Sequence, residues 1–216
     1  MPRYFVTGTD TDVGKTRVTA ALAAALRHRG APTTVVKLVQ TGLPPRVPGD
    51  AVRAGTLAGV DYLEFVRFAK PADPWSAALA QAAAPPRAAN LVYALDAVPG
   101  SVVVEGAGGL MVPLNADEHF GHVIAMAGLK TVVAIGVRLG CLNHALLTIE
   151  ACRHHRIALA GGVLVERWGP VAQAERDDVA RVLQGKLRLF GTLPFEPDEA
   201  RSVAEGAAMF ADLVQS

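Results

Sequence analysis

Short apolar runs alternate along the chain with longer stretches in which alanine and leucine recur at helical spacing. The apolar runs predict strands at residues 3–7, 34–39, 101–105, 131–137, 157–165 and 187–193. Helices are predicted over residues 15–29, 50–58, 76–84, 87–98, 143–155, 172–184 and 198–214. Because strands separated by helices need crossover connections, the pattern indicates a three-layer α/β fold, with a mostly parallel central sheet covered by helices on both faces.

Composition supports this interpretation. Hydrophobic residues make up 51% of the chain and aromatic residues only 6%, so the core is aliphatic, which suits buried parallel strands. The prolines and glycines of residues 42–49 predict a loop, and Gly30 is expected to end the first helix. Since the 216 residues contain no internal repeat, linker or charge run, residues 1–216 are interpreted as one domain.

The charge balance argues against nucleic-acid and membrane partners. Lysine and arginine number 21 against 20 acidic residues, so no basic footprint for nucleic acid or anionic lipid is expected. No apolar run is long enough to span a bilayer, and the early first strand predicts that there is no signal peptide. Cys141 and Cys152 are too few for a disulfide framework or a zinc site, so we expect a cytoplasmic protein.

A glycine-rich segment joins the first predicted strand to the first predicted helix. Residues 8–16 read Gly-Thr-Asp-Thr-Asp-Val-Gly-Lys-Thr, with five residues between Gly8 and Gly14 where the usual phosphate-binding loop has four. Backbone N–H groups at the helix start would hold a triphosphate, Lys15 would reach its β- and γ-phosphates, and Thr16 would take a magnesium position. The alternative is an ordinary tight turn that contains a lysine. In its strand–loop–helix context the motif predicts a P-loop NTPase fold.

Three further charged residues lie near the end of a predicted strand or at the start of a predicted helix. Lys37, inside the second apolar run, would face bound phosphate or an anionic substrate, or else lie on an edge strand and face water. Glu105 ends the third run before a glycine-rich turn, and we interpret it as an acid that serves the magnesium site rather than as a helix cap. Asp50 is either a simple N-cap or a second magnesium ligand.

Other polar segments allow weaker interpretations. Thr11 and Asp12, at the loop tip, could contact a second substrate. The turn at residues 140–144 is either an anion site or a plain turn capped by Asn143. His154 and His155 are expected at a solvated helix end.

The chain resembles the dethiobiotin synthetase family in four segments that occur in the family's order. They are residues 4–16; Lys-Leu-Val-Gln-Thr-Gly at 37–42; Val-Glu-Gly-Ala-Gly-Gly at 104–109 with Pro-Leu at 113–114; and Gly-Val-Arg-Leu-Gly-Cys-Leu-Asn-His at 136–144. The extra residue of the phosphate loop is itself the family's form. The resemblance implies that a diaminononanoate takes up carbon dioxide to give a carbamate, whose oxygen attacks the γ-phosphate of ATP. The second amine then closes the ureido ring and releases phosphate.

The resemblance also implies roles for individual residues. Lys37, Lys15 and Thr11 fall on catalytic positions, and Thr16, Asp50 and Glu105 on Mg²⁺ positions. The positions implied for binding the substrate are Thr11, Lys37, Thr41, Gly140, Cys141, Leu142 and Asn143, the last four supplied by the partner of a homodimer. The positions implied for binding the nucleotide are Asp12, Val13, Gly14, Lys15, Thr16, Arg17, Asp50, Glu105, Gly106, Ala107, Gly108, Val165, Glu166, Leu193, Pro194 and Phe195.

Two positions depart from the family's pattern. Leu38 replaces a frequent proline after the lysine, and Val165 replaces an asparagine whose amide reads the adenine edge. Since valine cannot make those hydrogen bonds, we expect weak discrimination among nucleoside triphosphates.

The rival interpretations are a positioning ATPase of the same fold and a non-catalytic nucleotide-binding module. ATPases of the first kind usually carry a second lysine near the start of the loop, where this chain has Thr9 and Asp10. A module that only binds nucleotide does not need Lys15, Thr16, Lys37 and Glu105 together.

Overall fold

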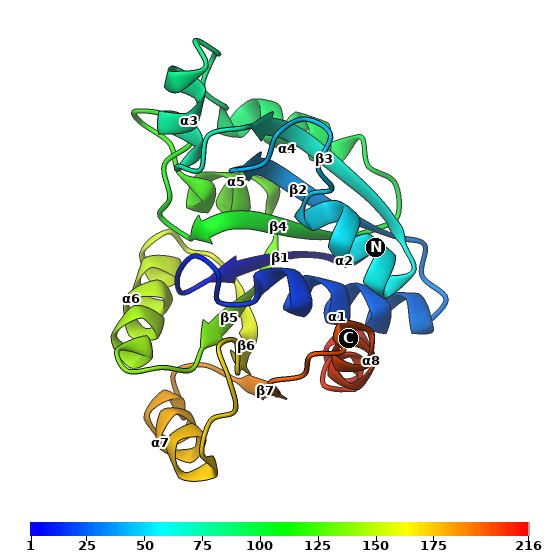
Figure 1. The fold of residues 1–216 in the computed structure, drawn as a ribbon, viewed down its shortest axis with the longest axis vertical. Helices are drawn as coiled ribbons and strands as arrows, with labels where there is room; N and C mark the ends of the chain where they lie inside the picture. The colour runs from blue at the N-terminus through cyan, green and yellow to red at the C-terminus, as the bar shows by residue number, and fades with distance from the viewer. Residues whose placement is uncertain (216) are drawn as a thin grey trace.

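A seven-stranded parallel sheet forms the centre of the molecule in the computed structural model, which describes residues 1–215. The strand order is β3-β2-β4-β1-β5-β6-β7, and each neighbouring pair is parallel (Figure 1). The strands are β1 (Arg3–Gly8), β2 (Thr33–Thr41), β3 (Asp61–Phe68), β4 (Ser101–Gly109), β5 (Lys130–Gly136), β6 (Leu159–Val165) and β7 (Leu189–Leu193). The P-loop strand β1 thus lies in the middle of the sheet.

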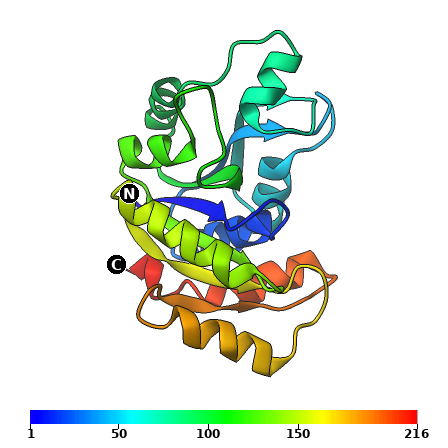
Figure 2. The same cartoon turned by 90° about the vertical axis from the view of Figure 1, so that its left-hand side faces the viewer.

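Helices cover both faces, which confirms the predicted three-layer α/β architecture (Figures 1 and 2). Helices α1 (Lys15–His28), α2 (Asp50–Ala58) and α8 (Glu199–Ala208) pack on one face against Tyr4, Val6 and Val103. The other face, with Phe5, Val36 and Val104, is covered by α3 (Pro74–Ala80), α4 (Ala88–Asp96) and α5 (Phe120–Ala127), and further along by α6 (Cys141–His154) and α7 (Gln173–Leu183). Neighbouring strand residues alternate between the two cores, as the period of a strand requires.

The structure contains two elements that the sequence pattern did not predict, β3 and α5. Strand β3 is an edge strand, and its Asp61, Glu64 and Arg67 interrupt the apolar run on which a prediction depends. Several predicted boundaries were also wrong: α3 ends at Ala80 and not at residue 84, and α6 begins at Cys141 and not at Asn143. Strand β4 continues through the glycines to Gly109, and α8 ends at Ala208, followed by a 3₁₀ turn at Leu213–Gln215.

The register of the sheet sets the geometry of the candidate site. Lys37 of β2 pairs with Glu105 of β4, and Glu105 also pairs with Val6 of β1, two residues before the P-loop. Since ligands bind at the carboxyl ends of parallel strands, this register gathers the charged residues beside the phosphate loop. Within residues 1–215 no helix is long and apolar enough to cross a membrane.

Candidate functional site

The phosphate loop turns into α1 at Gly14, which adopts the left-handed conformation with φ 94°. A Cβ atom at this residue would lie 2.8 Å from Cγ1 of Val165, so both the backbone angle and the close packing require glycine. The side chain of Lys15, the next residue, is folded back and donates from Nζ to the carbonyl oxygen of Asp10 at 2.9 Å. The N-terminus of α1 and the Lys15 ammonium therefore lie together, as a polyphosphate site requires.

Burial changes the acid–base behaviour of Lys15. Desolvation by burial, helped by the nearby Lys37 ammonium, outweighs the opposing Glu105 and Asp50 carboxylates and lowers the pKa of Lys15 to about 8. The ammonium is therefore poorly solvated in the free protein. A bound anion would restore the interactions that burial removes.

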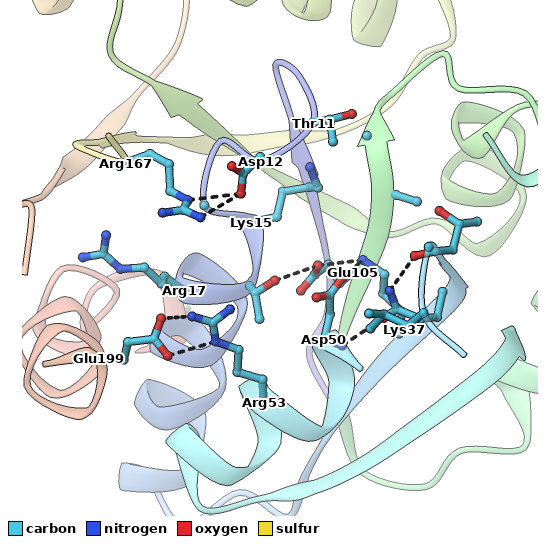
Figure 3. Close-up of a pocket in the computed structure, with 18 of the residues that line it drawn as sticks. Thr11, Asp12, Lys15, Arg17, Lys37, Asp50, Arg53, Glu105, Arg167 and Glu199 are labelled. Carbon is cyan, nitrogen blue, oxygen red and sulfur yellow. Dashed lines mark hydrogen bonds and ion pairs between the residues drawn. The ribbon is translucent and has the colours of Figure 1, made fainter. Parts of the chain in front are cut away.

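Lys37 lies at the centre of a buried ionic cluster (Figure 3). Its Nζ is 2.6 Å from Oδ2 of Asp50, 2.8 Å from Oε1 of Glu105 and 2.9 Å from the carbonyl oxygen of Gly106. These contacts engage all three N–H donors of the ammonium. Lys37 is 2% exposed and β2 is an interior strand, so the edge-strand alternative does not hold.

The cluster fixes the charge of its members. Burial alone would lower the pKa of Lys37, but the Glu105 and Asp50 carboxylates outweigh it and raise the pKa above its ordinary value. Burial likewise raises the pKa of Asp50, and the ion pair with Lys37 reverses the effect, so the carboxyl is held below its ordinary range. The hydroxyl of Thr16 donates to Oε1 of Glu105 at 3.1 Å, which joins the start of α1 to the cluster.

Asp50 reaches the cluster because a neighbouring side chain caps its helix. Asp50 is the first residue of α2, whose N-cap is Gly49, and its own side chain makes no capping hydrogen bond. Oε1 of Gln40 accepts the Asp50 backbone N–H at 2.9 Å instead. The N-cap interpretation of Asp50 is therefore wrong, and its carboxylate is available to Lys37.

The loop before Asp50 is held in place from β3. Arg67 donates from Nη1 to the carbonyl oxygens of Pro44 and Val47, at 2.9 and 2.8 Å, while Glu64 pairs with its Nη2 at 2.7 Å. The sequence pattern gave no hint of this anchor, because it did not predict β3.

A cavity of about 500 Å³ opens above the cluster. Of the predicted site residues, its lining includes Thr11, Asp12, Gly14, Lys15, Thr16, Arg17, Lys37, Thr41, Asp50, Glu105, Ala107, Gly108 and Phe195. The structure thus brings predicted phosphate and magnesium residues to one cavity with Thr11, Lys37 and Thr41 of the predicted substrate residues, although the segments that supply the lining lie between residues 11 and 199.

Several predicted residues lie beside the cavity rather than in its lining. Val13 and Val165 are buried in the core, as is Leu193. The carbonyl of Pro194 accepts from Arg17 at 2.7 Å. The Glu166 carboxylate pairs with Arg176 and accepts the Phe195 backbone N–H at 3.0 Å, so it shapes the segment that carries Phe195 into the cavity lining.

The structure requires a glycine at position 106 for a different reason from the predicted one. The sequence pattern favoured a glycine turn that lets a ligand approach, but Gly106 lies within β4, where a Cβ would meet Phe5 at 2.8 Å. Packing against that ring therefore requires glycine here, while the Gly106 carbonyl serves Lys37.

The turn at Gly140–Asn143 lies outside the cavity of its own chain. Gly140 is the N-cap of α6 in the left-handed conformation, and the fully exposed Leu139 precedes it. Arg138 ties this turn to the phosphate loop through Asp10 at 2.7 Å. The turn is thus tied to the phosphate loop without lining the cavity of its own chain.

Four charged residues that line the cavity are not among the predicted site residues: Arg53, Arg167, Glu196 and Glu199. Figure 3 labels Arg53, Arg167 and Glu199. Arg167 pairs with Asp12 at 2.9 Å, and Nε of Arg53 donates to Glu199 at 2.9 Å. The signal available for Arg167 was its place directly after a strand end; Arg53 and Glu199 lie on helices and carried none.

Comparisons with known proteins show the family of this chain. Residues 2–202 match the family model described as an AAA domain. The chain is 37% identical to the ATP-dependent dethiobiotin synthetase BioD of Anaeromyxobacter dehalogenans (strain 2CP-C), covering 100% of both sequences, and 40% identical to that of Rhodococcus jostii (strain RHA1), covering 94% of this chain and 90% of the relative.

Solved structures with the same fold are more distant. The cell division ATPase MinD of Pyrococcus furiosus aligns with a TM-score of 0.59 at 19% identity, over 100% of this chain and 98% of that one. A ParA family ATPase from Chlorobium tepidum TLS aligns with 0.58 at 12% identity, over 100% and 93%. At this identity the likeness shows the P-loop NTPase fold alone. The family follows from the closer relatives: the chain belongs to the ATP-dependent dethiobiotin synthetases.

Proposed function

We propose that this protein closes the ureido ring of dethiobiotin from 7,8-diaminononanoate, carbon dioxide and ATP, as a step of biotin biosynthesis. One observation carries the proposal: Lys37 lies between Glu105 of β4 and Asp50 at the start of α2, in the same cavity as the P-loop lysine. The arrangement suits phosphoryl transfer, which gains mostly from positioning and from neutralised charge.

The two lysines have separate tasks in this proposal. Lys15 releases the Asp10 carbonyl and binds the β- and γ-phosphates of ATP. Lys37 exchanges one of its carboxylate partners for the substrate oxyanion, a carbamate oxygen or the transferring phosphoryl group. No protein nucleophile is needed, because the carbamate attacks the γ-phosphate, ADP leaves, and the second amine then displaces phosphate from the carbamic carbon.

The residues present fit a magnesium ion. Oε2 of Glu105 is buried and has no hydrogen-bond partner within residues 1–215, which is a costly state for a carboxylate oxygen. With Asp50 and Thr16 it offers the hard oxygen ligands that Mg²⁺ prefers. When bound, the metal would neutralise charge on the phosphate oxygens. Thr16, Asp50 and Glu105 would hold it.

Substrate and base would occupy opposite parts of the cavity. Thr11 and Thr41 line it together with Lys37 and would face the carbamate. Arg167 and Phe195 line the far part, beside Glu166 and Val165, where the nucleobase would bind. The Val165 side chain is buried against Gly14 and offers no hydrogen bond to a base edge.

A homodimer would complete the substrate site. Residues Gly140, Cys141, Leu142 and Asn143 lie outside their own cavity, beside an exposed Leu139. The Cys141 N–H donates to the Arg138 carbonyl, so the N–H groups of Leu142 and Asn143 would bind the far carboxylate of the substrate in the partner. We propose that the enzyme acts in the cytoplasm, where its buried cysteines stay reduced.

The test is mass-spectrometric detection of the cyclised urea from diamine, bicarbonate, Mg²⁺ and a panel of nucleoside triphosphates. Product that requires both diamine and bicarbonate supports the proposal. Phosphate release that is the same without the diamine would instead favour a positioning ATPase of this fold.

A further inference from the structure

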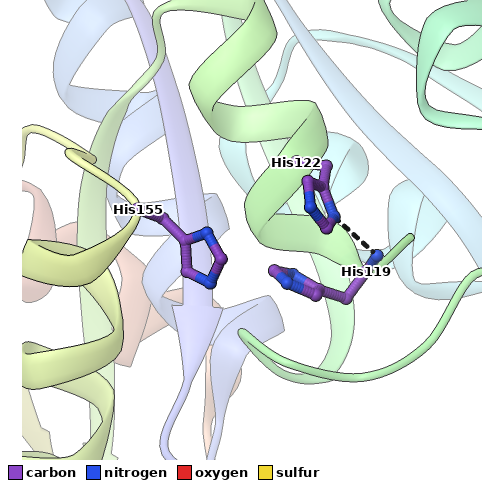
Figure 4. Close-up of side chains that lie close together, drawn as sticks. All are labelled: His119, His122 and His155. Atoms are coloured by element: carbon purple, nitrogen blue, oxygen red, sulfur yellow. Dashed lines mark hydrogen bonds between the residues drawn. The ribbon is translucent and has the colours of Figure 1, made fainter. Parts of the chain in front are cut away.

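Three histidines meet on the side of the sheet that carries α5 and α6, away from the proposed active site (Figure 4). His119 is the N-cap of α5, His122 lies in its first turn, and His155 is the C-cap of α6. Each is partly buried, and one ring nitrogen from each lies within 4.8 Å of the others. We propose that these three side chains form a binding site for a borderline divalent transition-metal ion of the zinc class.

The chemistry of the cluster selects the metal. Neutral imidazoles suit Zn²⁺, Co²⁺, Ni²⁺ and Cu²⁺, whereas Mg²⁺ prefers hard oxygen ligands, so this site and the carboxylate site would take different ions. Three imidazoles leave one position of a tetrahedral ion open to water. Tetrahedral Zn–N bonds set the nitrogens about 3.4 Å apart, a distance that small side-chain rotations reach from the observed spacing.

The rings are prepared to act as ligands. Burial, together with the neighbouring His122 and His155, lowers the pKa of His119 to about 4, so this ring is neutral at pH 7. Gly121 allows the His119 ring to fold over the helix start, since a Cβ there would lie 2.8 Å from the ring.

Metal binding would compete with the cap of α5. The backbone N–H of Gly121 donates to Nδ1 of His119, and that of His119 donates to Nδ1 of His122, both at 3.1 Å. A metal on Nδ1 displaces these hydrogen bonds, and a metal on Nε2 moves the ring proton to Nδ1, which then cannot accept. The bound ion would therefore exchange the helix cap for a link between α5 and the end of α6.

His155 allows a clean test, because no capping hydrogen bond of α5 involves its ring. We would titrate untagged protein with Co²⁺ and Zn²⁺ in excess Mg²⁺, following the visible Co²⁺ spectrum, Zn²⁺ displacement of Co²⁺, and amide exchange at Gly121. We expect one ion per chain and faster amide exchange at Gly121 when the ion binds. His155→Ala should bind the ion roughly 10–100-fold more weakly or worse, since the loss of an outer-shell partner alone reduces metal affinity by that factor.

The matched control is His154→Ala, which removes the exposed neighbouring histidine at the same helix end. Its affinity should equal that of the wild type. Absence of a stoichiometric ion, or equal binding by His155→Ala and wild type, would overturn the proposal. Equal losses in both variants would also overturn it, because the ion would then bind the helix end and not the cluster.

Discussion

Replacing Lys37 by methionine should harm both the fold and the reaction, and the structure indicates why. The ammonium satisfies Asp50, Glu105 and the Gly106 carbonyl at the same time, and it is 2% exposed. Lys37→Met would leave two adjacent carboxylates without a cationic partner in a site where Glu105 is 1% exposed. Breaking a buried ion pair by removing one member costs about 3–5 kcal/mol, so we expect a loss of unfolding free energy in that range.

Urea unfolding at neutral pH measures this loss, with Lys70→Met as the control because Lys70 is exposed. The double variant Lys37→Met/Glu105→Gln should be more stable than the sum of the single changes, because it removes both members of one pair. In the steady-state assay, turnover of Lys37→Met should fall about 10²–10³-fold, the effect of removing one donor to a developing oxyanion, while nucleotide binding by calorimetry changes little.

Two results would refute this reasoning. If Lys37→Met lost no more stability than Lys70→Met, and its effect simply added to that of Glu105→Gln, the cluster would not be an energetic unit. If the variant kept its turnover at saturation but bound nucleotide poorly, Lys37 would serve the nucleotide alone.

Three other predictions concern the same cavity. The pKa of Lys15 is lowered to about 8, chiefly by burial, and a polyphosphate requires its ammonium form, so nucleotide binding above pH 8 should take up protons and weaken as the pH rises. Calorimetry in buffers of different ionisation enthalpy measures this proton uptake, and no proton uptake at pH 9 would contradict the prediction. Since Val165 cannot read a base edge, ATP, CTP and GTP should give near-equal steady-state constants, and a strong preference for ATP would contradict this. Arg67→Ala should free the loop before Asp50 and raise the Mg²⁺ concentration needed for half-maximal activity several-fold, with little change in kcat at saturating Mg²⁺; an unchanged Mg²⁺ requirement would show that the anchor does not position Asp50.

The sequence was sufficient for the parts of the fold that depend on local pattern. The strand–loop–helix unit around Lys15 is continuous in sequence, and buried parallel strands read as plain apolar runs, so the sheet and its ligand edge could be predicted. The meeting of Lys37 and Glu105 followed from one further rule, that parallel strands end at the same edge, and the observed register pairs these residues directly.

What could not be predicted depends on partners far away in sequence. Asp50 has the sequence context of an N-cap, and only the Gln40 side chain from the adjacent strand end makes that role unnecessary. Strand β3 was not predicted because, as an edge strand, it carries charged residues that interrupt the apolar pattern. The anchor at Arg67, which lies on β3, was missed for the same reason. Gly106 could be recognised as a required glycine, but its reason, the Phe5 ring, is a contact across two strands.

The shared fold does not distinguish this chain from the ATPases that it resembles at 12–19% identity, so the distinction must lie in side chains. One such place is Asp10, in the part of the loop where positioning ATPases usually carry a second lysine. Here its backbone carbonyl accepts from Lys15, and its carboxylate pairs with Arg138 next to the α6 turn. Asp10 thus joins the phosphate loop to the turn that we assign to the partner's substrate. Dimerisation in this chain would then serve to build a substrate site, and nucleotide hydrolysis would not be needed to switch it.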